Sequence, residues 1–329
     1  MRVAIVGFGL IGQKRAKALG KEHELIIVAD KNIEKAKIAA NYNKNCLITS
    51  DWQKAASHKD IDMVIVSTTN DLLTPIGIYS LKAGKHVLIE KPGAKSLCEI
   101  ESFVKEAAMC QKKVKVGFSL RYHPALMKAK EILESGVLGE LMFIRGRYGH
   151  GGRIGYDKEW RADPNISGGG EMLDQGVHLI DLSRWFLGEF QHVSGFVNTY
   201  FWKMPVDDNG FMSLRTHKNQ MAWLHVSCSE WKNMFCLEIY GKNGKLQIDG
   251  LGGSYGVEKL TYYKMLPEMG PPETQVWDFP GEDDSWKKEF SGFVESVEKG
   301  SQVNGGLQDA CEALKIVKAI YKENNYDYC

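Results

Sequence analysis

The stretch that sets the architecture of the first half of the chain is RVAIVGFGLIGQKRAKAL, residues 2–19. Residues 2–6 form an apolar run typical of a buried parallel strand, and a helical segment follows through Leu19. Between them, Gly7 permits a tight turn, Gly9 lets backbone approach a pyrophosphate, and Gly12 lets the helix lie close to the strand. This order predicts a dinucleotide site with its phosphates at a helix N-terminus. The residues expected to contact the cofactor here are Gly7, Phe8, Gly9, Leu10, Ile11 and Gly12.

A second apolar run, residues 24–29, ends at Asp30. Its distance from the glycine turn is typical of an acid that accepts hydrogen bonds from the adenosine ribose hydroxyls. Asp30 would repel a 2′-phosphate, so NAD(H) is favoured over NADP(H), while Lys31 directly after it keeps NADP use open. Strands and helices continue to alternate after this point, which predicts a doubly wound parallel sheet. We expect a Rossmann domain over residues 1–118.

Two later strand ends of this domain carry polar residues. The apolar strand at residues 63–67 ends in Ser67, Thr68 and Asn70, at the edge of the sheet where such folds bind ligands. The strand at residues 86–89 ends in Glu90-Lys91-Pro92, and the proline cannot continue a central strand. Lys91 should therefore project beside the cofactor crevice, although a strand-end lysine taken alone is more often a solvated charge. The further cofactor contacts predicted here are Ser67, Thr68, Asn70, Glu90 and Lys91.

The segment GGGEMLDQGVHLIDLSRW, residues 168–185, places a carboxylate and an imidazole four residues apart. Asp174 and His178 would then share one face of a helix, where they could perform acid/base chemistry. The glycines ahead of the helix would leave backbone room for a ligand. On this segment alone, a salt-bridged surface helix with a satisfied histidine explains the pattern equally well.

Three features together resemble the glucose-fructose oxidoreductase, inositol dehydrogenase and rhizopine catabolism family, written Gfo/Idh/MocA. They are the glycine turn, the segment AGKHVLIEKP at residues 83–92, and the glycine-led segment at residues 168–185. The resemblance implies a two-domain pyridine-nucleotide oxidoreductase acting on a sugar, polyol or nucleotide sugar. It also implies a homo-oligomer, and catalytic roles for Lys91, Asp174 and His178. The chain departs from the pattern after Asn70, where many members have a histidine, and at Gly93, where a larger apolar residue is common.

The second half, residues 119–329, is expected to form an α+β domain with a large, open, mainly antiparallel sheet. Alternating runs between residues 193 and 263 predict a meander of strands, with a hairpin turn at Asn243-Gly244. A proline-rich loop is predicted over residues 265–281, and two final helices should brace both domains. One face of the sheet is a plausible subunit interface, and the aromatic residues expected along its edges are Trp202, Trp223, Trp231 and Phe235.

Residues 119–329 are also expected to bind the substrate and to form the oligomer. The loop YGHGGRIGYDKEWR, residues 148–161, combines glycines with aromatic and basic groups that suit a phosphate, carboxylate or nucleotide. We therefore expect an acidic or nucleotide-linked sugar, although aromatics that merely pack beneath the loop are an equal alternative. Arg121 and Tyr122 could line the pocket, or the arginine could tie the domains together. The predicted substrate contacts are Arg121, Tyr122, His150, Arg153, Tyr156, Trp160, Arg161, Asp174 and His178.

The composition narrows the function classes. With 42 basic and 41 acidic residues the formal net charge is +1, which gives no global field to attract nucleic acid or a membrane surface. The seven cysteines are odd in number and contain no CxxC pair, which indicates a reducing, cytoplasmic compartment and argues against a structural metal site. Apolar runs fall short of transmembrane length.

These observations lead to a functional hypothesis. We expect an NAD-dependent dehydrogenase that moves a hydride between nicotinamide and a carbinol or keto carbon of a sugar or nucleotide sugar. His178 would act as the base, Lys91 would polarise the oxygen, and Asp174 would orient the histidine or bind a hydroxyl. No metal is required. The alternatives are an inositol or other polyol dehydrogenase and, in a different class, a catalytically silent NAD-binding regulatory sensor, which would have no need of these three side chains together.

Overall fold

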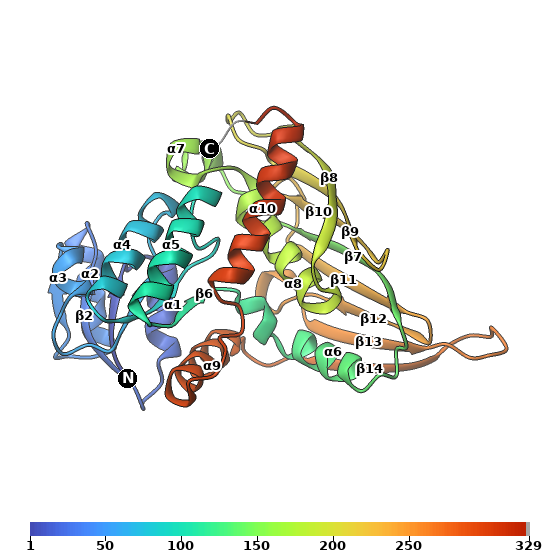
Figure 1. The fold of residues 1–329 in the computed structure, drawn as a ribbon, viewed down its shortest axis with the longest axis horizontal. Helices are drawn as coiled ribbons and strands as arrows, with labels where there is room; N and C mark the ends of the chain where they lie inside the picture. Colours follow the sequence, from blue (N-terminus) through green and yellow to red (C-terminus); the bar gives the residue numbers. More distant parts are fainter. Residues whose placement is uncertain (327–329) are drawn as a thin grey trace.

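The computed structural model describes residues 1–326. Two sheets lie side by side, and helices fill the space between them (Figure 1). The first sheet has six strands and the second has eight. The predicted fold class, a doubly wound parallel sheet followed by an α+β part with a large and mainly antiparallel sheet, is confirmed.

The first sheet has the strand order β3-β2-β1-β4-β5-β6, and each pair of neighbours is parallel. Strand β4 is an unbroken apolar run with no exposed residue, as expected for a strand covered by helices on both faces. The strands are β1 (Arg2–Val6), β2 (Glu24–Ala29), β3 (Leu47–Thr49), β4 (Met63–Val66), β5 (His86–Ile89) and β6 (Val114–Val116). The helices are α1 (Leu10–Ala18), α2 (Ile33–Lys37) with the 3₁₀ turn Ile38–Asn41, α3 (Trp52–Ala56), α4 (Asn70–Lys82) and α5 (Leu97–Cys110).

The second sheet has the strand order β14-β13-β12-β11-β7-β10-β9-β8. Its strands are β7 (Leu141–Gly149), β8 (Phe190–Asn198), β9 (Asn209–Thr216), β10 (Met221–Ser227), β11 (Met234–Gly241), β12 (Gly244–Asp249), β13 (Glu258–Lys264) and β14 (Glu273–Phe279). The helices of this half are α6 (Pro124–Glu134), α7 (Pro164–Ser167), α8 (Val177–Leu187), α9 (Ser285–Lys299) and α10 (Leu307–Glu323). Helices α6, α8 and α10 contact the sheet.

Three details of the expected fold were wrong. Strand β7 lies between β11 and β10 and runs parallel to β10, so the sheet is not a simple meander. Strand β14 occupies part of the expected loop at residues 265–281, because its backbone pairs with β13 although its side chains are mostly exposed. The sequence also predicts a helix that begins at Pro75, but α4 begins at Asn70 and contains Pro75 within it.

The closing helices lie between the two halves (Figure 1). Helix α9 packs against α1, whereas α10 packs against α5 and β6 on one side and against α8 and β8 on the other. The chain therefore places the carboxyl edge of the first sheet beside the helices that cover the second. In the described part of the chain, residues 1–326, no helix is long and apolar enough to cross a membrane.

Candidate active site

The glycine turn between β1 and α1 is held by contacts within the protein. Gly7 has φ +87°, and a Cβ there would lie 2.4 Å from the carbonyl oxygen of Ser67. A Cβ at Gly12 would lie 2.1 Å from the carbonyl oxygen of Gly7. A Cβ at Gly9 would meet nothing within 4 Å, so open space lies above the middle of the turn. The turn therefore fits the pyrophosphate of a dinucleotide, as the glycine spacing predicts.

Asp30 lies at the end of β2 and braces this turn. One of its carboxylate oxygens accepts the amide of Phe8 at 2.7 Å, and the other accepts the amide of Asn32 at 2.8 Å. Ser67 supports the turn from β4, because its hydroxyl donates to the carbonyl of Gly7 at 2.7 Å. Lys31 is exposed beside Asp30. These groups surround the place where an adenosine ribose would lie.

Two of the expected cofactor contacts lie elsewhere. The ring of Phe8 is fully buried in the core, so this residue supports the turn from inside. Glu90 is bound by Arg15 at 2.6 Å, and Arg15 also pairs with Glu289 of α9 at 2.5 Å. Glu90 therefore belongs to a buried ion-pair network that ties α1 to the strand end before Lys91. The side chains of Phe8 and Glu90 therefore do not face the cofactor crevice.

The turn yields a paired prediction. Gly12→Ala should destabilise the protein by about 2 kcal/mol, because its Cβ must displace backbone. Gly9→Ala should change the free energy of unfolding by less than about 0.5 kcal/mol, since the space above it is open. Gly9→Ala should nevertheless weaken NAD binding, because its methyl group would occupy the pyrophosphate's place. Denaturant unfolding and NAD titration of both variants test this, and a Gly12→Ala protein as stable as wild type would contradict it.

Lys91 and Asp174 are joined across the domain boundary. The Lys91 ammonium forms a short hydrogen-bonded ion pair with one carboxylate oxygen of Asp174 and also donates to the main-chain carbonyl of Asp174 at 2.7 Å. Arg161 approaches the second carboxylate oxygen at 3.2 Å. The two cations keep the pKa of Asp174 well below its usual range against the opposing effect of burial. Asp174 is therefore an anchor that holds the lysine ammonium at the junction.

The segment before α8 is not a regular helix. Residues Met172–Gly176 form a π-helical turn, and α8 continues from Val177. Such turns occur frequently at functional sites because they re-aim side chains within a helix. Asp174 lies inside the π turn and His178 lies just after it, so the simple four-residue spacing expected of one α-helical face does not apply here.

His178 is buried at the start of α8. Its Nδ1 atom has no hydrogen-bond partner within residues 1–326, and its ring lies edge-on to Phe118 and Tyr148. Burial, reinforced by the positive charge of Lys91, lowers the pKa of His178 from 6.5 to about 3. The imidazole is therefore neutral at ordinary pH.

Each glycine ahead of the π turn is closely approached by another segment of the protein. A Cβ at Gly168 would lie 2.2 Å from the Lys95 carbonyl, one at Gly169 would lie 2.5 Å from the Tyr321 hydroxyl, and one at Gly170 would lie 2.0 Å from the Asp207 carbonyl. The expected backbone room for a ligand is therefore filled by protein. The glycines instead let this segment pack tightly against Lys95, Tyr321 and Asp207.

A pocket opens beside Asp174. It is a small, partly open hollow in the protein surface. Asn70 at the start of α4 lies in its wall and donates to the Ser167 carbonyl at 2.8 Å, which joins the two halves. The wall includes the predicted residues Tyr156, Trp160, Arg161 and Asp174, and residues not predicted, among them Glu171, Met204, Val206 and Cys228.

The arginines of the 148–161 loop are already paired with acids. Arg153 is 2.6 Å from Glu159 and largely exposed, while Arg161 lies between Glu159 and Asp174 and is stacked over Trp160. Because carboxylates neutralise both guanidinium groups, the geometry gives little support to the expected anionic or nucleotide-linked substrate. A neutral sugar suits this wall better.

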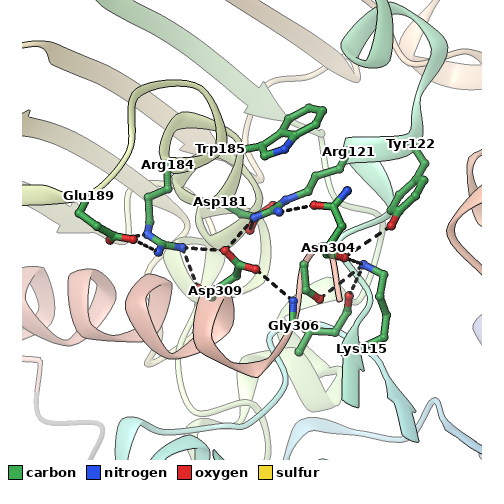
Figure 2. Close-up of polar contacts among 12 residues, drawn as sticks. Lys115, Arg121, Tyr122, Asp181, Arg184, Trp185, Glu189, Asn304, Gly306 and Asp309 are labelled. Carbon is green, nitrogen blue, oxygen red and sulfur yellow. Dashed lines mark hydrogen bonds and ion pairs between the residues drawn. The ribbon is translucent and has the colours of Figure 1, made fainter. Parts of the chain in front are cut away.

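Arg121 does not line the pocket, so this expectation was wrong. Its guanidinium forms two hydrogen bonds with Asp181, at 2.8 and 2.6 Å, and a third with the Asn304 side chain at 2.7 Å. Figure 2 shows this network continuing through Asp309. Tyr122 also points into this region, with Lys115 over its ring. Arg121 is thus the structural arginine that the sequence left as the alternative, and it ties α8 to the segment before α10.

Lys91, Asp174 and the neutral His178 lie together, and the first sheet carries a glycine turn that fits a pyrophosphate, as expected of a nicotinamide-dependent oxidoreductase. A family model described as an oxidoreductase family with an NAD-binding Rossmann fold matches residues 1–118. A second model, the Gfo/Idh/MocA C-terminal domain, matches residues 126–247. The chain belongs to the Gfo/Idh/MocA family of NAD-binding oxidoreductases, which confirms the resemblance, the enzyme class and NAD as cofactor.

Characterised relatives are similar over different spans. Inositol 2-dehydrogenase 4 of Saccharopolyspora erythraea is 29% identical over 97% of this chain and 92% of its own length. Levoglucosan dehydrogenase of Pseudarthrobacter phenanthrenivorans is 29% identical over 66% of this chain, and the match spans 58% of that protein. A solved structure of levoglucosan dehydrogenase in complex with NADH and L-sorbose shares the fold, with a TM-score of 0.88, 22% identity, and coverage of 99% of this chain and 97% of that one.

Proposed function

We propose that this chain oxidises a secondary hydroxyl of a neutral cyclic sugar, with NAD as the hydride acceptor. The observation that carries the proposal is the Lys91–Asp174 pair beside the neutral, buried His178 and a pocket in which Arg161 is paired with Asp174. The named relatives, which act on levoglucosan and inositol, support a sugar or polyol over an anionic nucleotide sugar. An inositol or other polyol remains the second candidate.

The proposed roles follow from charge development. As hydride leaves a carbinol carbon, negative charge grows on the oxygen, and the hydroxyl proton must go to a base. We assign this base to His178, whose imidazole is neutral and lies beside Lys91 and Asp174. Lys91 would stabilise the growing charge on the oxygen, and Asp174 and Arg161 would position the lysine and the sugar. Bound NAD would supply the hydride acceptor, with its pyrophosphate at Gly7, Gly9 and Gly12 and its adenosine ribose at Asp30.

The proposal is tested by incubating the protein with NAD, and separately NADP, against levoglucosan, inositols, free aldoses and sugar nucleotides. We expect NAD reduction with one or more neutral sugars or polyols and weaker reduction of NADP, because Asp30 faces the ribose. A preference for uridine-diphosphate sugars would contradict the neutral-sugar proposal and support the predicted anionic or nucleotide-linked substrate. Tight NAD binding without turnover on any panel member would contradict dehydrogenase activity and favour the regulatory sensor.

We also propose that the protein is a homo-oligomer built on the outer face of the second sheet. Strand β10 alternates, with Ala222, Leu224 and Val226 buried and Trp223 63% exposed. Phe196 on β8 is 71% exposed on the same sheet. Such aromatic exposure suits a subunit interface of dimers or tetramers. Phe235, which was expected at this edge, is buried against Tyr148 instead.

The six cysteines within residues 1–326 are free thiols. We propose that the protein is cytoplasmic, because its seven cysteines are odd in number and contain no CxxC pair.

A further inference from the structure

Glu171 is a buried carboxyl group without a hydrogen-bond partner in the wall of the pocket. The residue is 2% exposed, and neither side-chain oxygen has a donor within residues 1–326. It lies between Gly170, which packs on Asp207, and the π turn that carries Asp174. An ionised carboxylate without donors is costly to bury, whereas the neutral acid carries its own proton donor.

The charges around Glu171 favour this neutral acid. Burial is the main cause that raises the pKa of Glu171 well above its usual range, and the nearby Asp174 and Asp207 raise it further. Lys91 and Arg161 act in the opposite direction, but both are bound to Asp174. Asp207 is itself satisfied by the amides of Gly170 and Met172 and by the hydroxyl of Tyr321.

The remaining neighbours are uncharged. The Nδ1 of His150 accepts the Gly152 amide at 3.0 Å, so the neutral ring carries its proton on Nε2. Nε2 lies 3.6 Å from Glu171, which is beyond a hydrogen bond, and burial lowers the pKa of His150. Burial also raises the pKa of four neighbouring groups, which keeps them neutral: Tyr148, Tyr156, Cys228 and Tyr255.

We propose that Glu171 is a specificity-determining residue that binds a hydroxyl of the sugar directly, as the neutral acid. The carboxyl O–H would donate a hydrogen bond to the sugar oxygen, and the carboxyl C=O would accept a hydrogen bond from the sugar's own hydroxyl. A sugar that lacks this hydroxyl would leave the buried acid unpaired, which is a strong means of discrimination. The inference rests on the proposed function and adds the group that reads the substrate.

Two variants separate the neutral acid from a charge or a structural role. Glu171→Gln keeps a donor and an acceptor in nearly the same shape, whereas Glu171→Ala removes both. We expect Glu171→Ala to lower kcat/KM about 10- to 100-fold, mainly through KM, and Glu171→Gln to lower it less than about tenfold. In wild type, kcat/KM should fall as pH rises through the raised pKa of Glu171, because the donor is lost, and this fall should be missing in Glu171→Gln.

Other results would overturn the inference. Suppose that Glu171→Gln and Glu171→Ala lost kcat/KM equally, and that both kept the pH dependence of the wild type. Glu171 would then not bind the sugar as the neutral acid. A wild-type preference for amino sugars that Glu171→Gln abolishes would show that an ionised carboxylate reads a cation.

A second measurement is independent of turnover, so it separates failure of this inference from failure of the proposed dehydrogenase activity. Carbon-13 NMR of glutamate-labelled protein should show a protonated carboxyl resonance at neutral pH that is absent in Glu171→Gln. An ionised Glu171 at neutral pH would refute the inference even if the sugar panel succeeds.

Discussion

His178→Gln is expected to lower kcat for sugar oxidation by about 10²- to 10⁴-fold, the usual range for loss of a general base. Glutamine is close in size to histidine but cannot take a proton from the substrate hydroxyl at ordinary pH. The ring of His178 is buried between Phe118 and Tyr148, so the larger loss should appear in kcat and not in NAD affinity. Steady-state kinetics with the best panel sugar, together with an NAD titration, measure both.

His192→Gln provides the matched control, because His192 is an exposed residue of β8. It should retain wild-type kcat. If His178→Gln also retained kcat while NAD binding stayed intact, the assignment of His178 as the base would be wrong. Loss of NAD binding together with a lower melting temperature would instead point to a packing role.

The pH behaviour of His178 follows from its lowered pKa. In the unfolded chain the imidazole takes up a proton near pH 6.5, whereas in the folded protein it does so only near 3. The unfolded state therefore binds more protons between these values, and the contribution of this residue to stability is lost as pH falls through that window. Because His178 stays neutral in the folded protein near pH 6.5, its protonation should not lower kcat/KM there. Any fall of kcat/KM near pH 6.5 should therefore be the same in wild type and in His178→Gln.

Lys91→Met should have a comparably large effect, lowering kcat about 10²- to 10³-fold, because a preorganised charge at the reacting oxygen is removed. Methionine keeps the length of the side chain but cannot donate to Asp174. The carboxylate would then be held by Arg161 at 3.2 Å and exposed to less positive charge, so the pKa of Asp174 should rise from its depressed value. Kinetics and an NMR titration of aspartate-labelled protein check the two effects.

Lys82→Met serves as the control for this variant, since Lys82 ends α4 and its side chain is 60% exposed. It should leave kcat unchanged. If Lys91→Met turned over sugar at the wild-type rate, Lys91 would not stabilise the charge on the substrate oxygen. Its role would then be limited to the ion pair with Asp174.

Local patterns were enough to predict the first sheet. The glycine spacing, the acid at Asp30 and the apolar strands depend on residues close together in the chain, and each strand was found near its expected place. The same holds for Lys91, which follows β5 before a proline. Local signals suffice here because parallel strands separated by helices have few alternative arrangements.

Contacts between residues far apart in the chain could not be predicted from the sequence. The basic group of Arg121 suggested a ligand, but its partners lie at Asp181, Asn304 and Asp309, far along the chain. Pairing between β7 and β10 likewise joins segments separated by two other strands. Glu171 was not among the predicted site residues, because an acid beside a glycine run is typical of a solvated helix cap and its burial depends on the fold.

We propose that this site moves a hydride from a sugar carbon to NAD. The most direct test of this claim uses the panel sugar that reduces NAD fastest, deuterated at its carbinol carbons, followed by mass spectrometry of the reduced coenzyme. We expect deuterium in the nicotinamide of NADH, transferred by wild type and far more slowly by His178→Gln and Lys91→Met. Deuterium released to water while the coenzyme stays unlabelled, or no reduction with any panel sugar, would contradict the claim.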